Sequence, residues 1–208
     1  MGDLSMERAS FAARHDFDSL PLRSDVEVHC AQFSEIAALS DMARRFVPGV
    51  RIGEQELARY YAFDPESLLT FSRKGRLVGG MAFLFLNARG HDALLLDEIR
   101  LTEPDPHLLA DRDEEVSAIY IWAIAATGRG IAGLGKAAAH LRRPRLCNAD
   151  LFAQPSTDAG RDIMRATGFT PIASFQPDLW CYERPWNRQP LRLSNQVVPV
   201  RSFEDARH

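Results

Sequence analysis

Three closely spaced glycines mark the part of the sequence best suited to bind a ligand. They lie in the segment TGRGIAG, which runs from Thr127 to Gly133. Glycines leave no side chains between the backbone amides and a ligand, and the first N–H groups of a helix have no partner within it. If a helix begins here, those N–H groups and the positive end of its dipole favour an anion, most usefully a phosphate. Arg129, inside the segment, adds positive charge.

The sequence on either side of this segment predicts the elements that would hold the loop. From Val116 to Ala125, an isoleucine-rich apolar run with two aromatic residues predicts a buried strand. From Ile131 to Leu141, an alanine-rich stretch predicts a helix. A strand, a glycine turn and a helix in this order form the framework of a phosphate-binding site.

The same glycines admit a second interpretation, a dinucleotide-binding fold. Gly128, Gly130 and Gly133 are spaced GxGxxG, and Asp150 lies near the position expected of a ribose-binding acid. A dinucleotide domain would normally begin with this unit and continue in βαβ repeats, whereas here a long segment precedes it. A nucleotide-binding oxidoreductase is therefore the weaker alternative, and binding of a nicotinamide cofactor would distinguish it.

The loop resembles the acyl-CoA loop of the GNAT acyltransferase superfamily, whose motif Q/R-x-x-G-x-G/A opens a helix after a long strand. Thr127, Gly130 and Ala132 occupy its three defining positions, and Thr127 departs from the motif. A second segment, Pro155 to Phe169 (PSTDAGRDIMRATGF), looks like the family's later helix and its terminal Gly-Phe. The resemblance covers roughly residues 25 to 185 and implies the GNAT fold.

This resemblance implies which residues would bind coenzyme A. Main-chain N–H groups of the loop would hold its pyrophosphate, and backbone groups of the preceding strand would contact the pantetheine arm and the thioester carbonyl. The implied loop residues are Thr127, Gly128, Arg129, Gly130, Ile131, Ala132 and Gly133, and the implied strand residues are Trp122, Ala123 and Ile124.

Acyl transfer from a thioester to an amine also needs groups that handle protons. The amine must be deprotonated and the leaving thiolate protonated, so a base and an acid are sought. In the family a tyrosine four positions before the Gly-Phe often supplies the acid, and here that position is Met164, which has no proton to donate. Tyr182 on the last predicted strand and Tyr120 on the central one are substitute acids by residue type. Glu98, on a predicted strand, and Glu115 are candidate bases.

Composition limits the other classes of function. The chain has 208 residues, a net charge of −3 and 46% hydrophobic residues, which fits one compact domain and gives no basic excess for nucleic acid. Its arginine cluster at positions 142 to 145 is interpreted as a solvated helix end. Three cysteines without a CxxC pair predict neither a disulfide framework nor a metal site. No apolar run is long enough for a bilayer and no signal peptide is recognised, so we expect a cytoplasmic protein without membrane contact.

The order of elements predicts an α/β domain with a mixed, mostly antiparallel central sheet of six to seven strands flanked by helices. Predicted strands occupy 25–31, 68–71, 77–85, 116–125, 146–153, 171–175 and 179–183, and 92–101 could be a further strand. Predicted helices occupy 34–47, 53–61, 131–141 and about 156–168, with Ser34 as the N-cap of the first and Ser156 or Thr157 as the N-cap of the last. We expect a polar N-terminal arm (1–24), a single domain (25–185) and a C-terminal tail (186–208), with a homodimer possible.

These expectations converge on an acyltransferase. The reaction would transfer an acetyl or other acyl group from acyl-CoA to a small-molecule or peptide amine. One alternative is a non-catalytic member of the same fold that binds acyl-CoA as a sensor or scaffold, which would differ in showing no turnover. The oxidoreductase is the third interpretation.

Overall fold

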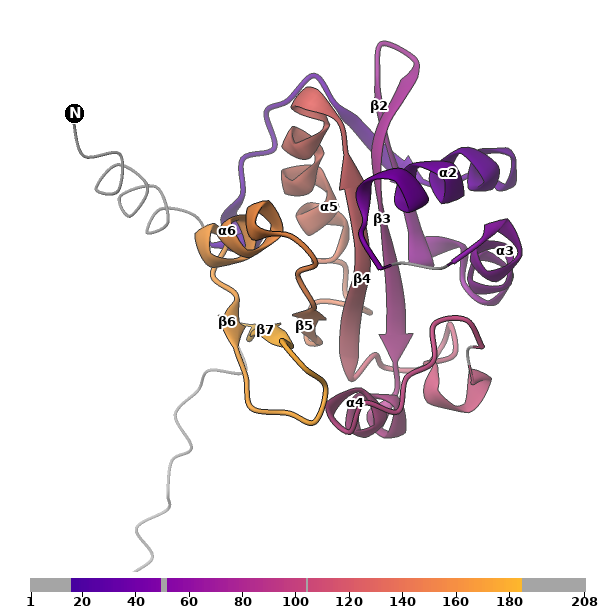
Figure 1. Cartoon of the computed structure of the whole chain (residues 1–208), viewed down its shortest axis with the longest axis vertical. Helices are drawn as coiled ribbons and strands as arrows, with labels where there is room; N and C mark the ends of the chain where they lie inside the picture. The colour runs from indigo at the N-terminus through magenta and orange to yellow at the C-terminus, as the bar shows by residue number, and fades with distance from the viewer. Residues whose placement is uncertain (1–15, 50–51, 104, 185–208) are drawn as a thin grey trace, which may run out of the picture.

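A computed structural model of the chain describes residues 16–49, 52–103 and 105–184, and these form one seven-stranded sheet with helices against it (Figure 1). The strand order is β1-β2-β3-β4-β5-β7-β6. Only the β4–β5 pair is parallel among the paired strands described. The strands are β1 (Glu27–Cys30), β2 (Leu68–Arg73), β3 (Arg76–Leu86), β4 (Ala118–Ala126), β5 (Asp150–Ala153), β6 (Thr170–Pro171) and β7 (Trp180–Tyr182).

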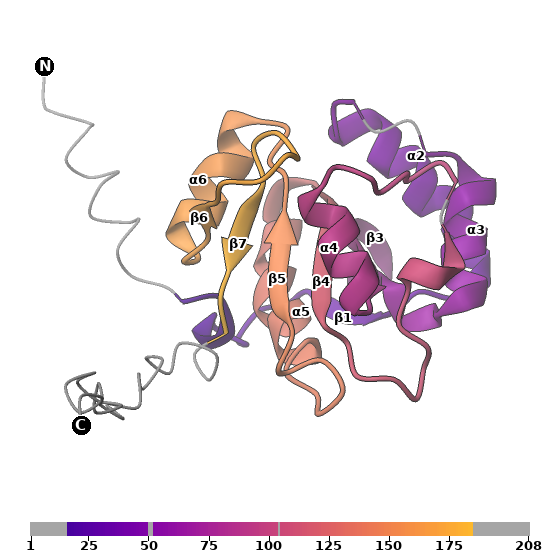
Figure 2. The same cartoon turned by 90° about the horizontal axis from the view of Figure 1, so that it is seen from below.

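The helices divide between two hydrophobic cores, one on each face of the sheet. The first core receives side chains from α5, α6 and the short helix η1, and the second from α2, α3 and α4. Figure 2 shows α2 and α3 toward the β1–β3 end of the sheet and α6 beside β6 and β7. The helices are η1 (Phe17–Ser19), η2 (Phe33–Glu35), α2 (Ile36–Phe46), α3 (Glu54–Phe63), η3 (Pro65–Ser67), α4 (Ala88–Leu95), η4 (Pro106–Leu108), η5 (Gly128–Gly133), α5 (Leu134–His140) and α6 (Asp158–Ala166).

The predicted fold class is confirmed, and so are most of its elements. The central strand, the β2–β3 hairpin and the two helices after the first strand lie within a few residues of their predicted positions. The hairpin turns at Lys74 and Gly75, both with positive φ, which suits the twist of its strands. Thr157 caps α6 as predicted, because its hydroxyl accepts a hydrogen bond from the N–H of Gly160 at 3.0 Å.

The strand suggested at 92–101 is wrong, and of the strand predicted at 171–175 only Pro171 belongs to a strand, β6. The segment 92–101 was expected to be extended, but α4 occupies its first half and a turn follows. The cause is an N-cap that precedes the segment: the side chain of Asn87 accepts from the N–H of Gly90, and the helix then buries Ala93 and Leu94 on one face. Glu98 consequently lies exposed beyond the helix rather than on a strand.

Two helix starts also differ from prediction. Ser34 does not cap α2, because the turn η2 contains it and the capping interaction uses Gln32 and Glu35, whose carboxylate accepts from the N–H of Gln32 at 2.8 Å. The helix expected from Ile131 begins as the 3₁₀ helix η5 and becomes α-helical only at Leu134.

The described residues before β1, which the sequence assigned to a polar arm, include an apolar side chain that packs into the first core. Phe17 is 2% exposed and contributes to the first core. Residues 1–15 and the predicted tail lie outside the described residues, so the domain boundaries remain predictions. Within the described segments, no helix has the length and apolar character needed to cross a bilayer, and no group of three or more His, Cys, Asp or Glu side chains is placed to hold a metal.

Candidate functional site

The sheet opens between its two parallel strands. The β4–β5 register ends at the pair Ile121 and Ala153, yet β4 continues to Ala126 while paired with β3 on its other side. After Ala153 the chain leaves the sheet through Pro155 and enters α6. The β4 edge beyond Ile121 is therefore not covered by β5, and its peptide groups face the opening between the strands.

A β-bulge lies at the start of this opening. Ala123 pairs with Ala82 and Ile121 pairs with Phe83, so Trp122 is the extra residue of β4. The bulge changes the alternation of side chains along β4. Up to the bulge the even-numbered residues Tyr120 and Trp122 face the second core, and after it the odd-numbered residues Ala123 and Ala125 do. The indole N–H of Trp122 is buried and has no hydrogen-bond partner among the described residues.

The opening leads into a cavity of about 270 Å³. Its outer part contains the exposed residues Ile131, Gln154 and Ala159, and its inner part contains side chains that are less than 10% exposed. The lining is mostly apolar. It comprises Phe17, Phe46, Val47, Ile121–Ala126, Ile131, Leu134, Ala153–Thr157, Ala159, Gly160, Ile163, Met164, Thr167 and Phe169.

The glycine loop lies at the end of the uncovered β4 edge. It is fixed to β3 through Thr127, whose N–H donates to the carbonyl of Val78 at 2.8 Å and whose hydroxyl donates to the same oxygen at 3.3 Å. Thr127 makes no side-chain cap, so the side chain that departs from the family motif holds the loop to the sheet instead. The first N–H groups of η5 are consequently not capped by Thr127.

The glycines of the loop have two different roles. Gly128 is exposed and has φ +53°, and a Cβ there would meet nothing within 4 Å. Gly130 is buried, and a Cβ there would lie 3.1 Å from the carbonyl carbon of Val78 and still closer to its oxygen. Gly128 therefore permits the left-handed turn, whereas Gly130 permits the close approach of the loop to β3.

The predicted strand and loop residues are brought together. Trp122, Ala123, Ile124 and Ile131 line the cavity, and Ile131 adjoins the rest of the loop in η5. Arg129 and Ala132 are exposed, whereas Gly133 is buried against the ring of Phe71. The exposed side of the loop is thus the side available to a ligand.

The proposed acid and base are not brought to this cavity. Tyr182 is buried in the first core, and its hydroxyl donates to the carboxylate of Asp16. Tyr120 lies on the opposite face, where its hydroxyl accepts from the amide of Gln176 at 3.3 Å and burial raises its pKa to about 12. Neither tyrosine lines the cavity, nor does Glu98, whereas Met164 does. Every described residue of the lining has a side chain that does not ionise.

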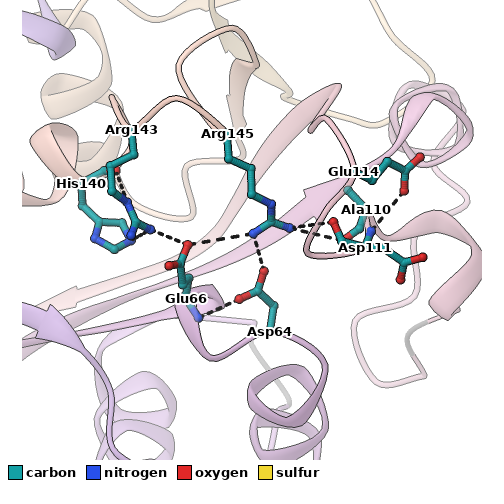
Figure 3. A network of polar contacts seen from close by, with 8 residues as sticks. All are labelled: Asp64, Glu66, Ala110, Asp111, Glu114, His140, Arg143 and Arg145. Carbon is teal, nitrogen blue, oxygen red and sulfur yellow. Dashed lines mark hydrogen bonds and ion pairs between the residues drawn. The ribbon is translucent and has the colours of Figure 1, made fainter.

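A network of charged side chains lies at the other end of α5 (Figure 3). The guanidinium of Arg145 donates to Asp64 at 2.7 Å, and Arg143 contacts Glu66 and, at 2.9 Å, the ring of His140. Burial, and then the neighbouring Arg143, lower the pKa of His140, which suits its role as an acceptor. The arginine cluster is therefore an anchor between α5 and the α3–β2 connection, and the expectation of a solvated helix end is wrong for Arg145.

No protein-family model matches the sequence, and no curated protein matches it. Comparison of the fold gives clear similarities. The loading GNATL domain of CurA from Lyngbya majuscula has a TM-score of 0.53 at 11% identity, over 76% of this chain and 97% of that one. Naa20 of Chaetomium thermophilum, solved in complex with a bisubstrate analogue, has a TM-score of 0.51 at 11% identity, over 81% of this chain and 93% of that one. At such identities the similarity is one of fold, and it confirms the predicted GNAT fold.

Proposed function

Because this chain has the GNAT fold, we propose that it binds acyl-CoA and transfers the acyl group to an amine. The observation that carries the proposal is the opening between β4 and β5, where an uncovered strand edge leads from a glycine loop into an apolar cavity. A pantetheine arm has amide groups that pair with a strand edge, and a pyrophosphate suits uncapped N–H groups at the start of a helix.

In this proposal the exposed side of the loop, Thr127 to Gly133, holds the pyrophosphate, with Arg129 adding charge. The pantetheine arm runs back along β4 from Ala126 toward Trp122. The thioester then lies near the bulge, where backbone groups of Trp122, Ala123 and Ile124 reach it. Acetyl-CoA is the simplest donor, and a small-molecule or peptide amine is the acceptor.

The chemistry is a direct displacement at the thioester carbonyl. The amine nitrogen forms the new C–N bond, the C–S bond breaks, and the proton lost by the amine is taken up by the thiolate or by solvent. Since the described lining offers no ionisable side chain, we propose that the acceptor reacts as the neutral amine already present in solution. Glu98 and Tyr182, the pair first considered as base and acid, have no position in this scheme because neither reaches the cavity.

A second candidate is a protein that binds acyl-CoA without transferring its acyl group. The observation that favours it is the same non-ionising lining, together with the thioether of Met164 where the family often has a tyrosine. The two candidates share the binding site and differ in turnover.

Calorimetric titration with acetyl-CoA, coenzyme A and NADPH, followed by a thiol-release assay over a panel of amines and peptides, separates these functions. The matched variants are Ala159→Trp and Ala88→Trp: both alanines are exposed at the start of a helix, but only Ala159 lines the cavity. We expect Ala159→Trp to abolish binding and Ala88→Trp to leave it unchanged. Binding without thiol release favours the non-catalytic candidate, and binding of NADPH instead of coenzyme A refutes both.

A further inference from the structure

One buried residue of the cavity lining comes from a segment outside the sheet. Phe17 belongs to η1, in the segment that precedes β1, and its ring lines the cavity although it is 2% exposed. The ring packs edge-on against Phe169, with centroids 5.6 Å apart, and in a tilted arrangement against Tyr182, with centroids 5.7 Å apart. The segment is drawn in indigo beside α6 in Figure 1.

Three anchors around Phe17 fix this ring in place. Its own N–H donates to the carbonyl of Thr167 at 2.9 Å. On one side Asp16 accepts from the hydroxyl of Tyr182, and on the other Asp18 is paired with Arg184.

The second of these pairs is held deep in the domain. Arg184 is fully buried, and besides its pairing with Asp18 it donates to the carbonyl of Leu141 at 2.9 Å and to that of Ala149 at 3.2 Å. An arginine satisfied in this way holds its partner rigidly. The wall of the cavity that Phe17 forms therefore has little freedom to move away from a ligand.

We propose that Phe17 sets the maximum length of the acyl chain that the cavity accepts. This inference rests on the proposed function, which places the pantetheine arm along the β4 edge with its acyl end toward Ile121 and Ala153, where the strands close. Met164, Phe169 and Phe17 line the cavity and belong to the same core as Ile121 and Ala153. Hydrocarbon is the ligand chemistry that suits such walls.

The effect of chain length follows from burial of methylene groups. Each methylene that enters an apolar cavity tightens binding roughly four-fold, until the chain meets a wall. A close-packed interior makes that limit abrupt, because it does not yield to an extra group without strain. Removing the phenyl ring of Phe17 should move the limit to longer chains.

The test is calorimetric titration of the full chain with coenzyme A and its acetyl, butyryl, hexanoyl and octanoyl thioesters. Phe17→Ala is compared with Phe85→Ala, which removes an equally buried ring that does not line this cavity. We expect the ratio of octanoyl-CoA to acetyl-CoA affinity to rise at least roughly ten-fold in Phe17→Ala and to stay unchanged in Phe85→Ala. Phe17→Leu, which keeps most of the packing, should give a smaller shift in the same direction.

The outcomes separate this inference from the function on which it rests. A wild-type protein that binds no coenzyme A thioester refutes the proposed function and this inference with it. Wild-type binding of acetyl-CoA with an unchanged chain-length profile in folded Phe17→Ala or Phe17→Leu refutes the inference alone. The same shift in Phe85→Ala would also overturn it, because the cause would then be general loosening of the core.

Discussion

Substitution of the loop glycines should separate the two roles that the structure gives them. A methyl group at Gly130 would approach the carbonyl of Val78 far inside normal contact distance. If the loop moves away, Thr127 loses both of its hydrogen bonds to that carbonyl, at 2.8 and 3.3 Å. Two such bonds contribute about 2 kcal/mol together, and residual overpacking adds at least about 1 kcal/mol. We therefore expect Gly130→Ala to lower the free energy of unfolding by about 3 kcal/mol, or Tm by roughly 6–12 °C.

Gly128→Ala is the matched control, because it adds the same methyl group where nothing lies within 4 Å. Its cost comes only from the left-handed backbone, about 1 kcal/mol, and Gly128→Asn should cost less because asparagine tolerates that conformation. Denaturant unfolding followed by circular dichroism measures all three variants. Equal stability of Gly130→Ala and wild type, or a larger loss in Gly128→Ala than in Gly130→Ala, would refute the separation of roles.

Three further expectations follow from the charged and ionisable groups. If the acceptor reacts as a neutral amine without a protein base, log kcat/KM should rise by one unit per pH unit up to the pKa of the amine itself. A plateau that begins at the same pH for amines of different pKa would contradict this. Arg145→Met should lower the free energy of unfolding by roughly 3 kcal/mol, because it leaves the carboxylate of Asp64, whose side chain is 5% exposed, without its cationic partner. Arg143→Met breaks a more exposed ion pair and should cost less than about 1 kcal/mol. Equal losses of stability in urea denaturation would argue against the network as an anchor. Burial, followed by the nearby Glu66, raises the pKa of the Cys30 thiol. The rate at which a disulfide reagent labels Cys30, measured as the difference between wild type and Cys30→Ser, should therefore still be rising at about pH 9. A labelling rate that becomes constant below about pH 8.5 would exclude a raised pKa.

The sequence was sufficient for the fold where local patterns and long-range packing agree. The long apolar strand β4, the hairpin at Lys74 and Gly75, and the Thr157 cap of α6 each have a local signal that the structure obeys. The segment 92–101 failed because its three consecutive leucines suit a strand as well as a helix, and the deciding cap, Asn87, lies outside it.

The loop and its strand could be predicted as a site because their residues are consecutive in the chain. Other parts of the cavity could not, because they depend on contacts between distant segments. Phe17 reaches the cavity through partners more than 140 residues away, Thr167 and Tyr182. The bulge at Trp122 depends on the register with β3, which no local pattern specifies. Tyr182 was selected by residue type alone, and in the structure its ring packs behind Phe17 and Phe169 while its hydroxyl donates to Asp16.

The position of the ligand is tested most directly by hydrogen–deuterium exchange of the full chain with and without acetyl-CoA. We expect protection in peptides that cover Trp122 to Gly133 and in the start of α6, because the proposed ligand pairs with that strand edge and covers that loop. Peptides around Asp64 and Arg145 should exchange at the same rate in both conditions. Binding of acetyl-CoA without protection of the β4 edge, or protection centred on the charged network, would contradict the assignment of the cavity as the acyl-CoA site.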